Sequence, residues 1–381
     1  AEVFHEKGGF DIVIANPPYG ADIDKSELKQ IVAKLKDTTN PNSAALFIDK
    51  AKNQLISKGG TLTYIVPKSL LYAEVWFSLV EALHRNVCIL VDVEKAFEKV
   101  KLEQVVFIYS PTVKSESYLA RKFLDSEFTT TTVIAKNLVP KLKAWVCGIT
   151  FGELEIVKSM ANHFVFMKDI SKTSRGAPIQ KYLSDKGSFP VIGGKNIFRF
   201  GYCGTKGFIS RKVYESYSQK MAFLNQPKIV SQRLVAQIQN PYPHIKLMAA
   251  YDSTGDILNV DTVENTVLTS NAYDFRYILG LLNSKFVSWY TYKVIFCSAI
   301  RTMDFDDYYV GKIPIPVLNT KEQEPLISIV NKVLDITKDE DYLSNVSKQA
   351  SVKELERQID QMVYEMYGLT GEEIGVVEGG R

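Results

Sequence analysis

The sequence of 381 residues lacks the features of a membrane, secreted or zinc-stabilised protein. It has no apolar run long enough to cross a bilayer, and its first residues do not resemble a signal peptide. Its four cysteines are far apart, and none lies in a Cys-x-x-Cys pair or near a histidine at zinc-ligand spacing. We therefore expect a cytoplasmic protein with reduced, mostly buried thiols, no metal site and no membrane partner.

Charge is distributed unevenly along the chain, although the net charge is only +3. Residues 165–235 contain thirteen Lys or Arg against three Asp or Glu, whereas residues 319–381 contain seven against thirteen. A basic middle segment predicts an anionic partner, and nucleic acid is the first candidate. The alternative is a solvated lysine-rich surface with no partner.

Short apolar runs and amphipathic stretches alternate over the first 110 residues. The expected elements are a buried strand over residues 10–15, a helix over 43–57 that Gly59 and Gly60 stop, a strand over 61–66, a helix over 69–85 and strands over 87–93 and 104–110. Strand, helix and strand form a parallel crossover, and the last two strands are close enough in sequence to be antiparallel. We therefore expect an α/β sheet that ends on an antiparallel pair.

Beyond about residue 150 the alternation is replaced by short segments separated by glycine and proline. The periodicity of residues 275–292 predicts a helix whose apolar face serves core packing. Near the end, a helix over residues 352–367 is expected to begin with a capping box of Ser351 and Glu354 and to end at Gly368. Its apolar stripe predicts docking or a helical partner.

The most specific chemical signal is Asn16-Pro17-Pro18-Tyr19, directly after the first strand. An exocyclic amine on an aromatic ring is a poor nucleophile because its lone pair is delocalised. The Asn16 side-chain oxygen and the Pro17 carbonyl can accept its two hydrogens and turn the lone pair out of the ring plane. Prolines stiffen the loop, and Tyr19 offers a ring face on which a flipped base can stack. The alternative is a strand-ending turn capped by asparagine.

Residues 11–19 resemble motif IV of amino-methyltransferases, and the chain as a whole is similar to TaqI-like adenine-N6 DNA methyltransferases, including those of type IIG restriction-modification enzymes. Residues 42–47 and 59–69 resemble the stretches that follow in that family, and residues 96–100 resemble its motif VIII. That resemblance implies that Phe97 packs on the other face of a flipped adenine. Without the family, burial of Phe97 in the core is the simpler interpretation.

The resemblance continues more weakly into the family's DNA-recognition domain. It is carried by five short segments, namely residues 174–176, 191–197, 228–230, 278–284 and 313–316, whose order and spacing coincide with the basic region. Gly193 and Gly194 can let the backbone approach a phosphate, or they form a simple turn. The candidates for contacts with double-stranded DNA are Arg175, Lys195, Arg199, Lys206 and Arg233.

These features together imply an α/β chain in three parts. Residues 1–150 are expected to form the C-terminal half of a Rossmann-like methyltransferase sheet, 151–320 an α+β DNA-recognition domain, and 321–381 a C-terminal helical segment. The resemblance implies S-adenosyl-L-methionine as methyl donor, with Asn16 and Pro18 beside it. The family's glycine-rich donor loop precedes motif IV, and only fifteen residues precede Asn16. We therefore expect an inactive fragment whose donor motif, together with any nuclease domain of the parent protein, lies upstream.

Other functions remain open at this point. A protein-glutamine methyltransferase or a ribosomal RNA methyltransferase can use the same loop, but neither accounts for the long downstream region. Cytosine N4 is an alternative target amine that the loop can hold equally well. A further alternative is a DNA-specificity module that binds its site and transfers nothing by itself.

Overall fold

The computed structural model describes residues 4, 6, 8–20, 23–97, 100 and 102–379. Contacts divide the chain into two compact units, each of which takes residues from more than one stretch of sequence. Unit 1 comprises Ala1–Ala161 and Lys293–Ile300, and unit 2 comprises Asn162–Tyr292 and Arg301–Arg381. The three-part division at residues 150 and 320 stays a prediction.

Unit 1 is built on a six-stranded mixed sheet in the order β1-β2-β4-β3-β5-β6. Its strands are β1 (Phe10–Ala15), β2 (Ile56–Pro67), β3 (Val87–Asp92), β4 (Gln104–Tyr109), β5 (Ser117–Leu124) and β6 (Glu127–Ala135). β1 and β2 are parallel, as the predicted crossover requires, and β4 is antiparallel to both β2 and β3. The sheet does not end on the β3–β4 pair as expected, because β5 joins β3 in parallel and continues into the β5–β6 hairpin.

The expectation that the first strand is buried is wrong. β1 pairs only with β2 among the described residues, so one of its edges has no neighbouring strand. Ile12 and Ile14 are 70% and 75% exposed. An apolar run therefore identified the strand correctly, but composition alone does not determine whether its faces are covered.

The connection between β1 and β2 also differs in detail from the prediction. Helix α2 (Lys25–Val32) precedes α3 (Ser43–Lys50), and a π-helical turn (Ala51–Leu55) follows α3. The helix thus ends before Gly59 and Gly60, which already lie within β2. A Cβ atom on Gly60 would lie 2.6 Å from the carbonyl oxygen of Phe10, so this glycine is needed where the β1 and β2 backbones approach each other.

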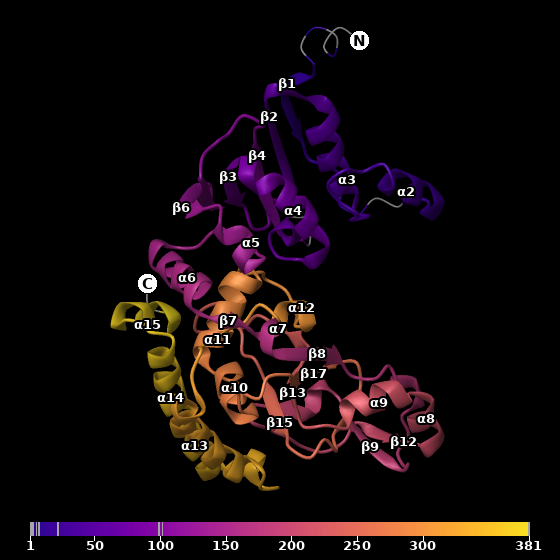
Figure 1. Ribbon diagram of the computed structural model, residues 1–381, viewed down its shortest axis with the longest axis vertical. Helices are drawn as coiled ribbons and strands as arrows, with labels where there is room; N and C mark the ends of the chain where they lie inside the picture. The colour runs from indigo at the N-terminus through magenta and orange to yellow at the C-terminus, as the bar shows by residue number, and fades with distance from the viewer. Residues whose placement is uncertain are drawn as a thin grey trace. The chain divides into compact units, whose positions relative to one another are not determined.

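The helix predicted over residues 69–85 is broken into shorter pieces. Two 3₁₀ turns (Lys68–Leu71 and Glu74–Trp76) precede α4 (Phe77–Leu83). In Figure 1, α4 lies in front of the strands of the unit 1 sheet. The unit is completed by α5 (Leu138–Leu142), most of α6 (Phe151–His163) and the segment Lys293–Ile300.

Unit 2 combines several small sheets with helices. Its largest sheet is antiparallel, in the order β15 (Ala249–Asp252), β13 (Lys228–Gln232), β17 (Val263–Leu268), β8 (Ser171–Arg175). A second sheet has the order β12 (Gly207–Ile209), β9 (Phe189–Ile192), β16 (Leu258–Asn259), and its core includes residues from α9 (Ser218–Leu224). The shorter elements are β7 (Val165–Phe166), α7 (Met167–Ile170), β10 (Ile197–Phe198), β11 (Gly201–Tyr202), α8 (Arg211–Ser216), β14 (Leu234–Val235), β18 (Met303–Asp304), α12 (Asp307–Val310) and β19 (Pro314–Ile315).

Helices form the end of the chain, as predicted. They are α13 (Thr320–Thr337), α14 (Val346–Met366) and α15 (Gly371–Val377). Two helices, α10 (Phe275–Leu282) and α11 (Lys285–Tyr290), lie earlier in unit 2. α13 and α14 pack side by side (Figure 1). The helix predicted over residues 275–292 is interrupted at Asn283, because Ser284 caps the start of α11.

The predicted capping box at Ser351 is wrong. α14 begins earlier and is capped by Asn345, so Ser351 lies inside the helix and its hydroxyl donates to the carbonyl of Ser347. The helix ends at Gly368 as predicted, and this glycine has a φ of +68°. The apolar stripe of α14 is buried within unit 2 at Val352, Ile359 and Val363.

The fold class is therefore the expected mixture of α and β structure with a helical C-terminal segment. None of the helices in the described part of the chain is both long and apolar enough to span a membrane.

Candidate functional site

The loop that follows β1 is held by the hydroxyl of Tyr19, whose single hydrogen is shared between two acceptor oxygens. The Tyr19 hydroxyl lies 2.9 Å from Oδ1 of Asn16 and 3.1 Å from the carbonyl oxygen of Ile65 in β2. Burial raises the pKa of Tyr19 above its ordinary value, so the phenol remains protonated near neutral pH. Tyr19 therefore fixes the side chain of Asn16 relative to the sheet.

Ser43, at the first turn of α3, braces the same loop. Its buried hydroxyl donates to the carbonyl of Pro18 at 2.6 Å and accepts from the amide of Gly20 at 3.0 Å. Asn42 caps the helix one residue earlier. Sequence reasoning noted residues 42–47 only as a family-like stretch, since nothing in the sequence shows that this serine reaches the loop.

The loop forms one wall of a pocket of about 650 Å³ in unit 1, within the roughly 300–1,000 Å³ typical of small-ligand sites. The pocket is lined by Asn16, Pro17, Pro18, Tyr19, Ala96, Phe97 and Val100. Phe97 comes from the connection between β3 and β4 and is 38% exposed. The structure thus brings Phe97 to the Asn-Pro-Pro-Tyr loop, across about eighty residues of sequence. Glu98 and Lys99 of the motif VIII-like stretch lie outside the described residues.

Buried polar contacts hold the connection that carries Phe97. Gln104 is fully buried at the start of β4, and its side-chain oxygen accepts from the amide of Ala96 at 2.8 Å. The backbone amide of Gln104 donates to the carbonyl of Glu94 at 2.7 Å. The aromatic wall of the pocket is therefore tied to the sheet, and neither contact was evident from the sequence.

Chemically, the pocket offers acceptors at one end and apolar surface elsewhere. An amide oxygen has two lone pairs, so Asn16 can accept from Tyr19 and from one further N–H group. The proline, alanine, phenylalanine and valine side chains suit a flat aromatic ligand. Such a pocket can hold a heteroaromatic amine by its hydrogens.

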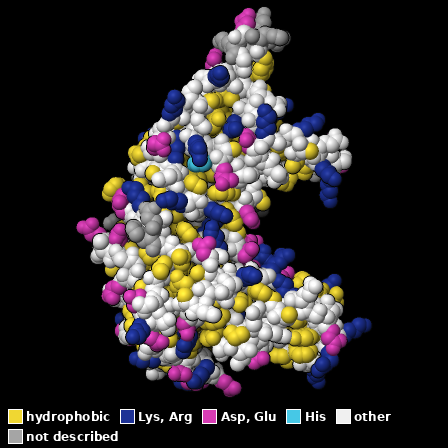
Figure 2. Space-filling view, viewed as in Figure 1, with side chains coloured by type: hydrophobic (Ala, Val, Ile, Leu, Met, Phe, Trp, Pro, Cys, Tyr) yellow, Lys and Arg dark blue, Asp and Glu magenta, His cyan; other side chains and the backbone are white. Residues whose placement is uncertain are grey.

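The five candidate DNA contacts all lie in unit 2 but differ in whether their side chains are exposed to solvent or paired within the unit. Arg175, Lys195 and Lys206 are exposed. Figure 2 shows further Lys and Arg side chains at the end of unit 2 that carries α8, α9, β9 and β12. These side chains are accessible to an anionic partner.

Arg199 and Arg233 are instead engaged inside unit 2. Nε of Arg199 lies 2.9 Å from Oε1 of Glu356 in α14, and the same guanidinium donates to the carbonyl of Asn283. Nε of Arg233 lies 3.4 Å from Asp304 and 3.6 Å from Glu264. Both side chains are about one-fifth exposed, and the guanidinium of Arg199 already pairs with Glu356 and that of Arg233 with Asp304.

Contacts within unit 2 explain why glycine occurs at positions 193 and 194, so no phosphate contact is needed to explain these residues. The amide of Gly193 donates to Oδ1 of Asn196 at 2.9 Å, and that of Gly194 to the hydroxyl of Thr262 at 3.1 Å. A Cβ atom on Gly194 would lie 3.0 Å from the carbonyl oxygen of Thr262. Both amides are therefore used within the fold, and of the two alternatives the turn explains this pair.

The residues present fit only part of a methyl-donor site. Asn16 and Pro18 line the pocket at the end of β1, where the family resemblance puts the transferred methyl group. Among the described residues no glycine-rich turn leads from a strand of the unit 1 sheet into a helix, the arrangement that holds the rest of such a donor. Gly201, Gly204 and Gly207 lie in the β11–β12 region of unit 2.

Two family models match different parts of the chain. The model of the Eco57I restriction-modification methylase family matches residues 1–97, and that of the TaqI-like C-terminal specificity domain matches residues 189–315. A putative type II restriction enzyme and methyltransferase from Methanocaldococcus jannaschii is 22% identical over 386 residues, which cover 94% of this chain and 31% of the relative. The chain thus spans about a third of that relative's length.

Among solved structures, the type IIL restriction-modification enzyme MmeI in complex with DNA aligns with a TM-score of 0.53 and 11% identity, covering 96% of this chain and 56% of that one. This likeness concerns the fold. The type IIG restriction endonuclease BpuSI aligns with a TM-score of 0.35 and 12% identity, covering 94% and 54%. By these matches, residues 1–97 are similar to the Eco57I restriction-modification methylase family and residues 189–315 to the TaqI-like C-terminal specificity domain.

Proposed function

We propose that the protein is the substrate-binding and DNA-reading part of a site-specific DNA methyltransferase that modifies the N6 amine of adenine, within a restriction-modification system. The observation that carries this proposal is the pocket in which Phe97 faces the same space as Asn16 and Tyr19. Two aromatic side chains and one amide acceptor suit a planar base with an exocyclic amine. The match to a restriction-modification methylase family supports the reaction class.

In the proposed mechanism the target adenine leaves the duplex and enters the pocket between Tyr19 and Phe97. Oδ1 of Asn16 and the carbonyl of Pro17 accept the two N6 hydrogens, which localises the nitrogen lone pair. Tyr19 holds Oδ1 of Asn16 directly, and Ser43 holds the loop through the carbonyl of Pro18, so little reorganisation is needed when charge develops on the amine. S-Adenosyl-L-methionine supplies the methyl group when bound.

The target sequence is selected by unit 2 in this proposal. The match to a TaqI-like specificity domain covers much of the basic region. Arg175, Lys195 and Lys206 are the proposed contacts to duplex DNA, because they are exposed. Arg199 and Arg233 are proposed to act indirectly, by holding the recognition surface in shape through their ion pairs.

A second candidate function is a specificity module that binds DNA without transferring a methyl group. It is favoured by the exposed basic residues of unit 2 and by the match to a TaqI-like C-terminal specificity domain. The two functions share DNA binding and differ only in transfer, so they are separated by assaying this chain and a longer form of the protein in parallel.

The product identifies the target amine. Duplex DNA is incubated with the active enzyme and S-adenosyl-L-methionine, digested to nucleosides and separated by chromatography. The proposal predicts N6-methyladenine as the methylated nucleoside. N4-Methylcytosine would overturn the target assignment, and methylated protein or RNA with unmodified DNA would overturn the function.

A further inference from the structure

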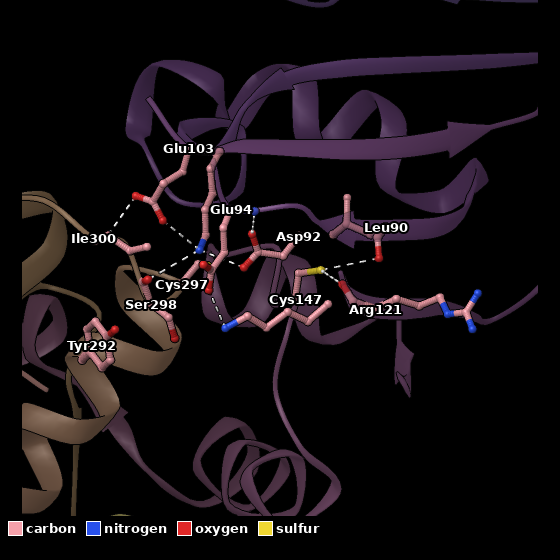
Figure 3. Close-up of polar contacts among 12 residues, drawn as sticks. Leu90, Asp92, Glu94, Glu103, Arg121, Cys147, Tyr292, Cys297, Ser298 and Ile300 are labelled. Atoms are coloured by element: carbon pink, nitrogen blue, oxygen red, sulfur yellow. Dashed lines mark hydrogen bonds and ion pairs between the residues drawn. The ribbon is translucent and has the colours of Figure 1, made fainter. Parts of the chain in front are cut away.

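A buried ion cluster lies at the base of the loop that carries Phe97. Nζ of Lys68 lies 2.8 Å from Oδ2 of Asp92 and 3.2 Å from Oε1 of Glu103. The three side chains are 3–5% exposed. Figure 3 shows Asp92 and Glu103 with their polar contacts. One cation between two carboxylates is costly to bury, so this arrangement needs an explanation.

The cluster joins the two ends of the Phe97 loop. Asp92 is the last residue of β3 and Glu103 directly precedes β4, so the loop begins and ends at the two carboxylates that Lys68 holds. The backbone amide of Lys68 also donates to the carbonyl of Glu103 at 2.8 Å. Oδ1 of Asp92 accepts from the amide of Glu94, three residues before Phe97, at 3.0 Å.

The same cluster holds the segment Lys293–Ile300. Oε2 of Glu103 accepts from the amide of Ile300 at 2.8 Å, and Nζ of Lys68 lies 3.5 Å from the carbonyl of Ser298 (Figure 3). This segment packs within unit 1, although the residues before and after it in the sequence belong to unit 2. It also lies within the stretch that matches the specificity domain.

The backbone of this segment is strained beside the cluster. Cys297 and Ser298 have φ values of +47° and +55°, a conformation that side chains other than glycine disfavour. Consecutive residues in this region persist only where the surroundings impose them. Burial by itself lowers the pKa of Lys68, but Asp92 and Glu103 outweigh it and raise the pKa, so Lys68 stays charged at any physiological pH.

We infer that Lys68 is a positioning residue that forms a clamp, which holds the Phe97 loop and the Lys293–Ile300 segment together as one element. A segment within the match to the specificity domain thereby fixes the position of Phe97, the aromatic wall of the base pocket. The clamp is a physical property of unit 1. Its use in coupling DNA reading to base binding rests on the proposed function. No methyl or proton transfer is assigned to Lys68, which acts through Asp92 and Glu103.

The clamp is tested by hydrogen–deuterium exchange with mass spectrometry on the full chain. In Lys68→Met, peptides covering residues 94–97 and residues 298–300 should both exchange at least ten-fold faster, while peptides of β13 and β17 keep their original rates. Lys68→Arg, which keeps the positive charge, should restore slow exchange in both segments. Release of one segment alone, or of neither, overturns the inference.

Two further variants serve as a control and as a substitute for Lys68→Met. Lys52→Met removes another Lys–carboxylate pair of unit 1, with Asp37 at 2.9 Å, and should change neither segment. If Lys68→Met does not fold, Glu103→Gln removes one charge but keeps the side-chain size and an oxygen to accept from Ile300. It should still speed exchange of both segments together, by about three-fold or more, and separate behaviour of the segments contradicts the clamp.

Coupling is tested by adding long unmethylated duplex DNA, which contains many short sequence combinations. DNA should slow exchange of both segments in the original protein, but in Lys68→Met it should slow exchange only within residues 189–235. Equal DNA protection of the Phe97 loop in both proteins overturns the coupling. Absence of DNA protection anywhere overturns the DNA-binding function, whereas joint release by Lys68→Met still supports the clamp.

Discussion

Tyr19 donates its hydroxyl hydrogen to Oδ1 of Asn16 across 2.9 Å, three residues earlier in the same loop. Tyr19 thus has two separable roles in the proposed pocket: its hydroxyl orients the amide acceptor, and its ring offers a stacking surface. The second hydroxyl contact, to the carbonyl of Ile65, fixes the ring on β2.

These roles predict different effects for two substitutions of Tyr19. Tyr19→Phe keeps the ring and loses one hydrogen bond to Asn16, worth roughly 0.5–1.5 kcal/mol, so turnover should fall about 2- to 10-fold. Tyr19→Ala also loses base stacking of about 1–3 kcal/mol and should be slower still. Methyl transfer to duplex DNA by the active enzyme measures both. Equal activity of the two variants would show that the ring does not stack on the base.

Exposed lysines of unit 2 should control the salt dependence of DNA binding. If Lys195 and Lys206 both contact phosphates, replacing both by alanine should flatten the slope of log affinity against log salt by about 1.8. Fluorescence anisotropy of a labelled duplex at several salt concentrations gives the slope. An unchanged slope, with unchanged sequence preference, places the DNA elsewhere on the protein.

Arg199, in the same basic region, should affect the stability of the protein rather than the salt dependence of DNA binding. Its guanidinium is paired with Glu356, so Arg199→Ala leaves a half-buried carboxylate without its partner. We expect a loss of about 1–3 kcal/mol in the free energy of unfolding and no change in the salt slope. Urea unfolding and the same anisotropy titration separate the two effects. A slope reduced by about one with unchanged stability would assign Arg199 to a phosphate instead.

Unit 2 should lose stability as pH rises because of Glu264. This carboxyl is 1% exposed, and burial raises its pKa from 4.5 to about 8 despite the nearby Arg233. Between these values the folded protein keeps a proton that the unfolded chain has released, so the free energy of unfolding falls with pH, by at most about 1.4 kcal/mol per unit. The contribution is complete below pH 4.5 and lost above pH 8.

Glu264→Gln isolates this contribution because glutamine resembles the neutral carboxyl and does not titrate. Urea unfolding of unit 2 between pH 4.5 and 9 should show a shallower pH dependence in the variant than in the original protein. Parallel curves for the two proteins would contradict a raised pKa at Glu264.

Local patterns in the sequence predicted β1, β2, β3 and β4 of unit 1 but not β5 or β6, and the chemistry of the loop after β1 stays a prediction. The apolar run at residues 10–15 and the two prolines after it define β1 and its end, and the crossover to β2 follows from strand and helix order. Exposure of Ile12 and Ile14 could not be predicted, because it depends on which strands lie beside β1. The cap of α14 was misplaced because Asn345 and Ser351 are both suitable caps, and propensity does not choose between them.

Contacts between residues far apart in the sequence were beyond sequence reasoning. Residues 96–100 were singled out only by the family resemblance. The β3–β4 connection brings Ala96, Phe97 and Val100 of this stretch into one pocket with Asn16. Ser43, Gln104 and Lys68 have no motif of their own, although each holds part of that pocket in place. The internal pairing of Arg199 likewise depends on α14, which lies more than a hundred residues downstream.

The central claim is that Asn16 holds the amine of a flipped adenine, and Asn16→Ala tests it most directly. Loss of one preorganised acceptor acts on the transition state, so methyl transfer by the active enzyme should fall about 100-fold or more. DNA affinity, which unit 2 supplies, should stay within a few fold. The measurement is transfer of a tritiated methyl group to duplex DNA, with anisotropy on the same preparations. Near-original formation of N6-methyladenine by Asn16→Ala would contradict the account.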